Sequence, residues 1–297
     1  MQLLQQEDFL KNRVLRNLEI NDKETYCVYF ENVLDSINNQ VKSLPVLLDL
    51  VTRKIEYLDF DFEPYGFFFK DELLILKVNE SEHTILYAYD LNTKTTNRII
   101  SFPFQLKETF IREDEIFFVA DIQKNHRKAC ASCSEKSPFY NEGIGVVGER
   151  ITGIFRSSFD GKNIKIITSL DMNVDQVDFD GIHSRIMFTA FKVDPIKSID
   201  SDVYTYDMNK ALLTKFTKGH YRIGFIKSMT TEHLIFTGTD LRIKSRNDNQ
   251  QLYLIDIEQV SFQRLGAHID RSNEICAVMT DSSCSSSKPI NKYRDAF

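Results

Sequence analysis

The sequence predicts an all-β protein: a β-propeller with about five four-stranded blades, preceded by a short N-terminal helix. Three observations support this fold class. Phe and Tyr, which favour strands, number 23 and 12 in the 297 residues, and Trp is absent. Short apolar runs separated by polar turn clusters dominate the chain. One hairpin pattern also recurs five times, mostly at the interval of about 40–50 residues that one blade occupies.

The first segment, residues 1–13, is predicted to be a helix. Most of its apolar positions fall on one helical face: Leu3, Leu4, Phe9, Leu10 and Val14. Sustained helical periodicity is not found after this point. We therefore expect the blades over residues 14–268. Residues 269–297 would be the start of a further blade or a disordered tail.

The repeated hairpin consists of a strand that ends near an Asp, a short polar turn, and a second strand that ends in an aliphatic residue or Thr. Its five occurrences centre on Asp49, Asp90, Asp160, Asp207 and Asp256. The side chain of an Asp at such a turn is placed to accept hydrogen bonds from backbone amides two residues further on. The same hairpin therefore closes each predicted unit.

The intervals between these Asp residues are 41, 70, 47 and 49 positions, so three of the four match one blade. The longer interval fits if about 23 residues are inserted into a blade of ordinary length. Residues 123–149 form a polar segment with Gly and Pro at the right place. This segment is predicted to be a loop inserted in the third blade.

Two further strands precede each hairpin and complete a unit of four. In chain order they are Val14–Ile20 and Thr25–Val33, Tyr65–Phe69 and Glu72–Val78, Leu106–Ile111 and Glu115–Ile122, Asn173–Phe179 and Ser184–Phe191, and Arg222–Ser228 and His233–Gly238. The second strand of each pair is the most apolar, as expected of a strand covered on both faces. The alternative fold is an irregular β-sandwich with coincidental spacing. Five units with the same internal order favour the propeller.

Composition limits the classes of function. Lys and Arg number 37 against 43 Asp and Glu, so the chain lacks the basic surface expected of a nucleic-acid-binding protein. No stretch approaches the roughly 18 apolar residues of a membrane helix, and the start of the chain has no signal-peptide pattern. The odd count of five cysteines fits a reducing compartment. We expect a cytoplasmic protein that binds neither nucleic acid nor membrane.

One cluster has metal-ligand spacing: His126, Cys130 and Cys133, inside the inserted segment. A structural zinc site needs four ligands, and Cys276 and Cys284 lie far along the chain. Reduced loop thiols are therefore the favoured interpretation, with these three residues as the candidates for a metal site. No cofactor is expected.

Other motifs have plainer interpretations. Gly143, Gly145 and Gly148 spell G-x-G-x-x-G, but a dinucleotide site needs a preceding strand and a following helix, so a flexible loop is favoured. The polar run Leu241–Gln251 is predicted to be a solvated loop, with contact to a partner domain as the alternative. The remaining histidines lie near turns or strand starts, and none is paired with a Ser or Cys in a recognisable arrangement: His83, His183, His220, His233 and His268.

Two segments resemble a known family. Residues 7–30 resemble the entry to the propeller of the prolyl oligopeptidase family of serine peptidases, in its bacterial acylaminoacyl-peptidase-like branch: an acidic pair, a short helix, a strand, a polar turn and an aromatic-rich strand. Ser137–Gly145, SPFYNEGIG, is similar to the Pro-Phe-Trp-x-Asn-Gly-like segment of that branch. There it precedes a strand, an Asp turn and a terminal Thr, which here would be Phe155, Asp160 and Thr168. The resemblance covers residues 6–270. Tyr140 and Glu142 depart from the family pattern.

The resemblance implies a C-terminal α/β-hydrolase domain with a G-x-S-x-G nucleophile elbow and a following Asp and His. No G-x-S-x-G occurs in this sequence, and the family implies a seven-bladed propeller. We therefore expect the chain to be an incomplete propeller at the N-terminal end of a longer peptidase, without catalytic residues of its own. It would gate the access of short peptides to the hydrolase domain, and its open strand edges would allow self-association.

Two other functions remain. The first is a stand-alone propeller that acts as a protein-interaction scaffold, for which pairing of the first and last strands is the distinguishing feature. The second is an enzyme with its site inside the propeller. This last hypothesis lacks a visible cluster of carboxylates or metal ligands in the sequence.

Overall fold

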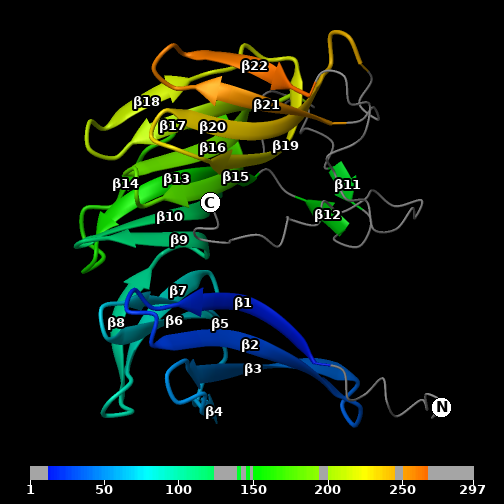
Figure 1. Cartoon of the computed structure of the whole chain (residues 1–297). Coiled ribbons are helices and arrows are strands. Elements are labelled where there is room, and N and C mark those ends of the chain that lie inside the picture. The colour runs from blue at the N-terminus through cyan, green and yellow to red at the C-terminus, as the bar shows by residue number, and fades with distance from the viewer. Residues whose placement is uncertain are drawn as a thin grey trace, which may run out of the picture. The chain divides into compact units, whose positions relative to one another are not determined.

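The computed structural model describes residues 13–123, 139–141, 145–147, 150–193, 200–244 and 250–266. Every regular element within these residues is a β-strand. The strands form five separate four-stranded sheets and one two-stranded hairpin (Figure 1). The five four-stranded sheets confirm the predicted all-β fold of propeller blades. The predicted helix covers residues 1–13, of which residues 1–12 lie outside the described part of the chain.

Each sheet is a meander whose strands lie in sequence order. The first contains β1 (Val14–Ile20), β2 (Tyr26–Asp35), β3 (Gln40–Asp49) and β4 (Ile55–Tyr57). The second contains β5 (Pro64–Lys70), β6 (Leu73–Glu80), β7 (His83–Asp90) and β8 (Thr96–Phe102). The third contains β9 (Leu106–Arg112), β10 (Glu115–Gln123), β13 (Arg150–Ser158) and β14 (Lys165–Ile166).

The last two sheets repeat the same order. The fourth contains β15 (Met172–Asp180), β16 (Arg185–Lys192), β17 (Asp202–Asp207) and β18 (Leu212–Lys215). The fifth contains β19 (Tyr221–Ser228), β20 (His233–Asp240), β21 (Gln251–Asp256) and β22 (Ser261–Leu265). All ten predicted first and second strands are present, with bounds that differ from the prediction by no more than two residues.

The inserted segment is only partly the loop that the sequence predicts. Between β10 and β13 the structure places a short antiparallel hairpin, β11 (Phe139–Asn141) and β12 (Gly145–Val147). Gly145 therefore begins a strand instead of lying in a flexible loop, because its backbone pairs with Asn141 across the hairpin. Gly143 and Gly148 lie outside the described residues.

The Asp residue that marks each repeat acts as predicted. In four hairpins its Oδ1 atom accepts a hydrogen bond from the backbone amide two residues on, at 2.8–3.0 Å. In the fifth, Asp256 accepts from the amide of Gln259, three residues on, at 2.8 Å. These bonds fix the turn locally, and they explain why the repeat can be read from the sequence.

Four of these turns share a second feature. The fourth residue after the Asp adopts a left-handed backbone conformation: Arg53, Lys94, Ala211 and Val260, with φ of 59°, 57°, 51° and 49°. Glycine adopts this conformation without steric cost, whereas other residues are strained there. Val260 is the most unfavourable of the four because its side chain is branched at Cβ.

The chain divides into two compact units, each with its own core. The first unit is Met1–Lys107, Glu113–Ile116 and Ser157–Ile164; the second is Glu108–Arg112, Phe117–Arg156 and Lys165–Phe297. In the first unit, apolar residues of the first and second sheets pack together around Val28, Phe30, Leu74 and Leu76. The central strands are the most buried, as predicted: Val28, Leu74, Ile186 and Phe236 are fully buried.

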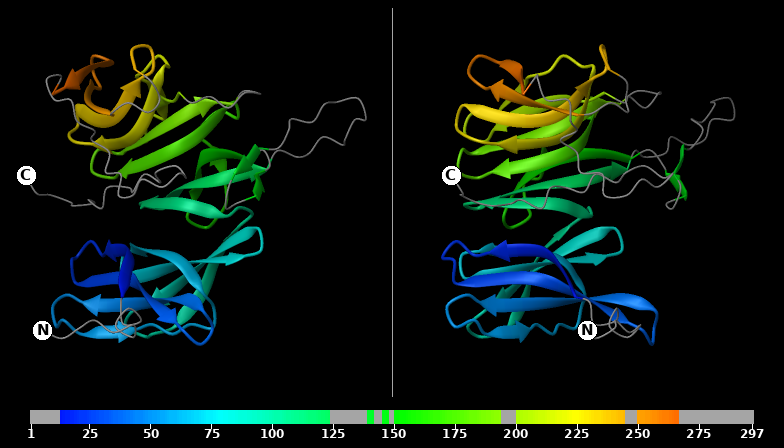
Figure 2. Two further views of the ribbon diagram at one scale, coloured as in Figure 1. Left: turned by 90° about the vertical axis from the view of Figure 1, so that its right-hand side faces the viewer. Right: turned by 45° about the vertical axis from the view of Figure 1, so that its right-hand side comes forward.

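In the second unit, two clusters join consecutive sheets. Phe117 and Ile154 of the third sheet pack with Ile186 and Phe188 of the fourth. Met187 and Val203 of the fourth sheet pack with apolar residues of the fifth. The fifth sheet therefore lies face to face with the fourth, as both views of Figure 2 show. A pocket lies at the edge of this contact between the fourth and fifth sheets.

Candidate functional site at the margin of the fourth and fifth sheets

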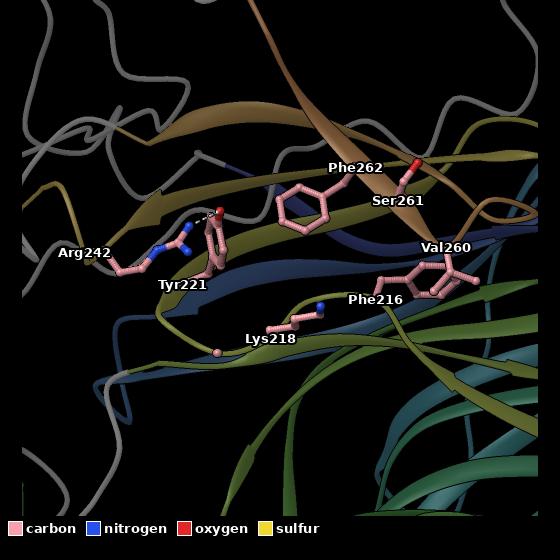
Figure 3. Close-up of a pocket in the computed structure, with 8 residues that line it drawn as sticks. Phe216, Lys218, Tyr221, Arg242, Val260, Ser261 and Phe262 are labelled. Atoms are coloured by element: carbon pink, nitrogen blue, oxygen red, sulfur yellow. Dashed lines mark hydrogen bonds between the residues drawn. The ribbon is translucent and has the colours of Figure 1, made fainter.

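A pocket of about 290 Å³ opens in the second unit where the connection from β18 to β19 meets the hairpin β21–β22. The connection contributes Phe216, Lys218 and Gly219, and the hairpin contributes Val260, Ser261 and Phe262 (Figure 3). Tyr221 at the start of β19 and Arg242 just after β20 complete the lining. The pocket therefore joins residues from two consecutive sheets.

The connection is held in place by one carboxylate. Asp202 at the start of β17 accepts hydrogen bonds from the Thr217 hydroxyl at 2.7 Å and from the Gly219 amide at 2.5 Å. Gly219 has a φ of 78°, a conformation that glycine adopts freely. Lys215 forms an ion pair with the same carboxylate at 2.6 Å. The charge of Asp202 is therefore neutralised by Lys215, and its hydrogen bonds hold the connection between β18 and β19 in place.

The apolar wall of the pocket is a group of rings. The ring of Tyr221 lies edge-on to those of Phe236, Tyr253 and Phe262, with centroids 6.1, 5.6 and 5.6 Å apart. Edge-to-face contacts of this kind add to the stabilisation that burial gives. Tyr221, Phe236 and Tyr253 are buried, so this wall is rigid.

The Arg242 side chain is held against this wall by a bidentate ion pair with Asp240. Its Nε and Nη2 atoms donate to the two carboxylate oxygens of Asp240 at 2.9 and 2.6 Å. Nη2 also lies 3.2 Å from the Tyr221 hydroxyl (Figure 3). The hydrogen bond from Arg242 lowers the pKa of Asp240, and the same pairing raises the pKa of the guanidinium. Burial and the charge of Asp240 raise the pKa of Tyr221, so its hydroxyl stays protonated at neutral pH.

Lys218 is the other cation of the pocket. It forms no ion pair with any residue that the structure describes. Of the carboxylates near the pocket, Asp202 and Asp240 pair with Lys215 and Arg242, and Asp200 accepts a hydrogen bond from the His220 amide at 3.1 Å. In Figure 3 its ammonium group projects from the floor of the pocket toward Phe216. The pocket thus combines an apolar wall with the ammonium group of Lys218.

A second polar cluster brings together Ser, His and Asp, which the sequence reading did not anticipate. The imidazole Nδ1 of His183 lies 2.6 Å from Oδ2 of Asp180, and the Ser228 hydroxyl donates to the same Oδ2. No hydrogen bond joins Ser228 to His183. A hydrolytic triad requires the imidazole between the hydroxyl and the carboxylate, so that it can take the hydroxyl proton. Here the carboxylate is in the middle, so Ser228 has no base.

The cluster instead ties the fourth sheet to the fifth. Arg185 on β16 reaches the buried Asp180 at 3.5 Å and donates to the carbonyls of Thr230 and Thr231 at 2.9 and 2.8 Å. Burial acts to raise the pKa of Asp180, but the hydrogen bonds from Ser228 and His183 outweigh it and lower that pKa. The carboxylate is therefore ionised and structural.

The other histidines and the metal candidates of the sequence are scattered. His83 and His233 begin β7 and β20, and His220 directly precedes β19, as their sequence positions indicate. The candidates His126, Cys130 and Cys133 lie outside the described residues, as do Cys276, Cys284 and His268. Among the residues that are described, no group of three His, Cys, Asp or Glu side chains is arranged to hold a metal ion.

The polar run Leu241–Gln251 differs from the predicted solvated loop at both described ends. Arg242 near its start is held by Asp240 and lines the pocket. Gln250 and Gln251 near its end are buried. Gln250 fits because Gly224 has no side chain: a Cβ there would approach its Oε1 within 2.1 Å. The spacing Asp240-x-Arg242 was a usable signal for the ion pair, but nothing local marks Lys218 or Val260.

Comparison with known proteins identifies solved structures with a similar fold. No protein-family model and no curated protein matches the sequence. Solved structures do match. An acylaminoacyl peptidase from Pyrococcus horikoshii aligns with a TM-score of 0.60 and 13% identity over 89% of this chain. The dipeptidyl peptidase 4 of Porphyromonas gingivalis aligns with a TM-score of 0.54 and 10% identity over 86% of the chain. The fold is a β-propeller like theirs.

The resemblance that the sequence predicts is therefore confirmed at the level of fold. The chain spans 41% of the length of the acylaminoacyl peptidase and 37% of the dipeptidyl peptidase. An apocarotenoid oxygenase from Synechocystis also aligns, with a TM-score of 0.53 and 9% identity over 88% of this chain and 64% of that one. Similar folds thus serve different chemistries, and the function of this chain does not follow from its fold alone.

In the described part of the chain, no helix is both long and apolar enough to cross a membrane.

Proposed function

We propose that the chain is the propeller segment of a bacterial, cytoplasmic serine peptidase of the prolyl oligopeptidase family. In this proposal it is not catalytic itself and limits the access of short peptides to a C-terminal α/β-hydrolase domain. The observation that carries the proposal is the five-sheet fold, which aligns over 89% of the chain with less than half of an acylaminoacyl peptidase. The sequence resemblance of residues 7–30 and 137–145 supports the same family.

The chemistry of the chain supports a non-catalytic role. The sequence contains no G-x-S-x-G elbow. The cluster of Ser228, His183 and Asp180 has the wrong connectivity for nucleophilic catalysis. The blades form a set of sheets that are packed against one another through buried apolar clusters. Such walls suit the exclusion of large substrates.

The proposal is tested on the complete gene product. We expect the reading frame that continues after the codon for Phe297 to encode a hydrolase domain with G-x-S-x-G. We also expect the whole protein to cleave short acyl-peptides and to leave the same scissile sequence uncut inside a folded protein. A continuing frame without such a domain, or equal cleavage of both substrates, would contradict the proposal.

A protein-interaction scaffold is the second candidate, and one observation favours it. β1 is an end strand of the first sheet, and it exposes apolar side chains, with Leu15 at 57% and Leu18 at 54%. An end strand of this kind is a template for pairing with another chain. Light scattering of the purified chain tests self-association through such edges. A monomer at every concentration would exclude it.

A further inference from the structure

We propose that the pocket between the fourth and fifth sheets binds an apolar carboxylate, either a free carboxylic acid or the C-terminal residue of a peptide. The site is built entirely from the second unit. It does not depend on a hydrolase domain, so this proposal goes beyond the function proposed above and can fail independently of it.

The size of the pocket sets the size of the ligand. Sites for drug-sized molecules have volumes of about 300–1,000 Å³. At about 290 Å³, this pocket lies at the lower end of that range. A single amino-acid residue or a compact aromatic acid has a size that suits this space.

The charge of the pocket selects the polar group of the ligand. Arg242 is neutralised by the bidentate pair with Asp240, and Lys218 is the lining cation that forms no ion pair with a described residue. The Nη1 atom of Arg242 forms no hydrogen bond with a described residue, so it offers a further donor. The ammonium group of Lys218 and the free edge of the Arg242 guanidinium are donors of the kind that bind a carboxylate through charge-assisted hydrogen bonds.

The rest of the lining selects the apolar body. Phe216, Val260 and Phe262 stand on the side of the pocket away from Arg242 in Figure 3. Aromatic rings bind an aromatic or aliphatic side chain by burial and edge-to-face contact. A ligand with its carboxylate near Lys218 and its side chain among these three residues would satisfy both halves of the site.

Val260 contributes an apolar side chain to the pocket from a turn position with a left-handed backbone. It is a β-branched residue with a φ of 49°, and the equivalent turn of the fourth sheet has Ala211 at the same place. Arg53 and Lys94 adopt the same conformation in their turns, so it is a property of the repeated hairpin, and the β-branched side chain makes it least favourable at Val260. Here glycine would relieve the strain but would remove the side chain that lines the pocket.

Replacement of Val260 by glycine should therefore raise the stability of the protein and weaken ligand binding, and both effects can be measured. Isothermal titration calorimetry would use N-acetyl-L-phenylalanine, its carboxamide and the peptide Ala-Ala-Phe. We expect both acids to bind and the amide to bind at least about tenfold more weakly, because a charge-assisted hydrogen bond is lost. Stronger binding of the peptide would assign the site to peptide C-termini, and stronger binding of N-acetyl-L-phenylalanine would assign it to free acids. Both results support a carboxylate site.

Four variants complete the experiment. Lys218→Gln and Val260→Gly should each weaken the binding of the acids by about tenfold, and Val260→Gly should also raise the melting temperature. Ala211→Gly is the matched control, since it relieves the same strain in the fourth sheet without touching the pocket. Lys210→Gln is the control for loss of a lysine. Absence of binding to all three probes, equal binding of acid and amide, or unchanged binding by Lys218→Gln would overturn the proposal.

Discussion

Ser228 and His183 meet at one atom, Oδ2 of Asp180. This geometry places a carboxylate where a triad needs an imidazole, and it explains how a Ser, a His and an Asp can be brought together without forming a nucleophile. The same carboxylate receives Arg185 from β16, while Ser228 ends β19. The cluster is therefore a polar tie between two blades.

The first prediction concerns this tie. Ser228→Ala should lower the free energy of unfolding by about 1–2 kcal/mol, because a buried carboxylate loses a hydrogen bond. Urea denaturation followed by circular dichroism measures the change. Ser36→Ala, in an exposed turn, is the control and should have little effect. Equal stability of Ser228→Ala and the wild type would mean that Ser228 contributes nothing to the contact between these sheets.

The second prediction concerns the left-handed turn positions. Ala211→Gly should raise the free energy of unfolding by about 1 kcal/mol, because glycine adopts a φ of 51° without strain. Ala88→Gly, within β7, is the opposite control and should destabilise the protein. A lower melting temperature for Ala211→Gly would show that this turn is not strained.

The third prediction concerns the buried glutamine. Gly224→Ala should destabilise the protein by about 2 kcal/mol, because a Cβ would displace Gln250, which accepts a hydrogen bond from Thr237 at 2.9 Å. The double variant Gly224→Ala/Gln250→Ala separates the clash from the backbone effect. It should be no less stable than Gln250→Ala alone. A strictly additive loss would mean that the two residues are not coupled.

The fourth prediction concerns acid. Hydrogen bonds from backbone amides lower the pKa of Asp49 and Asp90, and the Ser158 hydroxyl with Lys162 lowers that of Asp160 to about 2. Each carboxylate is more acidic in the folded state, so its stabilisation is complete above the unfolded pKa and is lost as pH falls through the folded one. The melting temperature should therefore fall as the pH decreases below about 4.

Asp160→Asn tests the assignment to the turn carboxylates. The amide oxygen can still accept the Lys162 amide hydrogen bond, but it does not titrate in this range. The variant should therefore have a shallower dependence of melting temperature on acid pH than the wild type. An identical pH profile would assign the acid sensitivity to other carboxylates.

Most of the fold could be predicted because its signals are local. Apolar runs such as Leu73–Glu80 and Arg185–Lys192 are central strands in the structure. The Asp turns are recognisable because their hydrogen bonds span only two or three residues. The hairpin β11–β12 was missed because short strands in a segment with Gly and Pro have no alternating apolar pattern.

The candidate site was much less predictable. Lys218 and Val260 lie 42 positions apart, and only the packing of the fifth sheet on the fourth brings them to one pocket. Gln250 looked like a loop residue, because the space beside Gly224 that it fills is a property of the folded backbone. Polar side chains at such positions acquire their role from neighbours that are distant in sequence.

We propose that these blades belong to a serine peptidase and do not catalyse hydrolysis themselves. Incubation of the purified chain with acyl-peptide and ester substrates, with and without a serine-directed inhibitor, tests it most directly. The account predicts no turnover above the buffer rate and no covalent labelling of any serine, Ser228 included. Turnover that the inhibitor abolishes would contradict it.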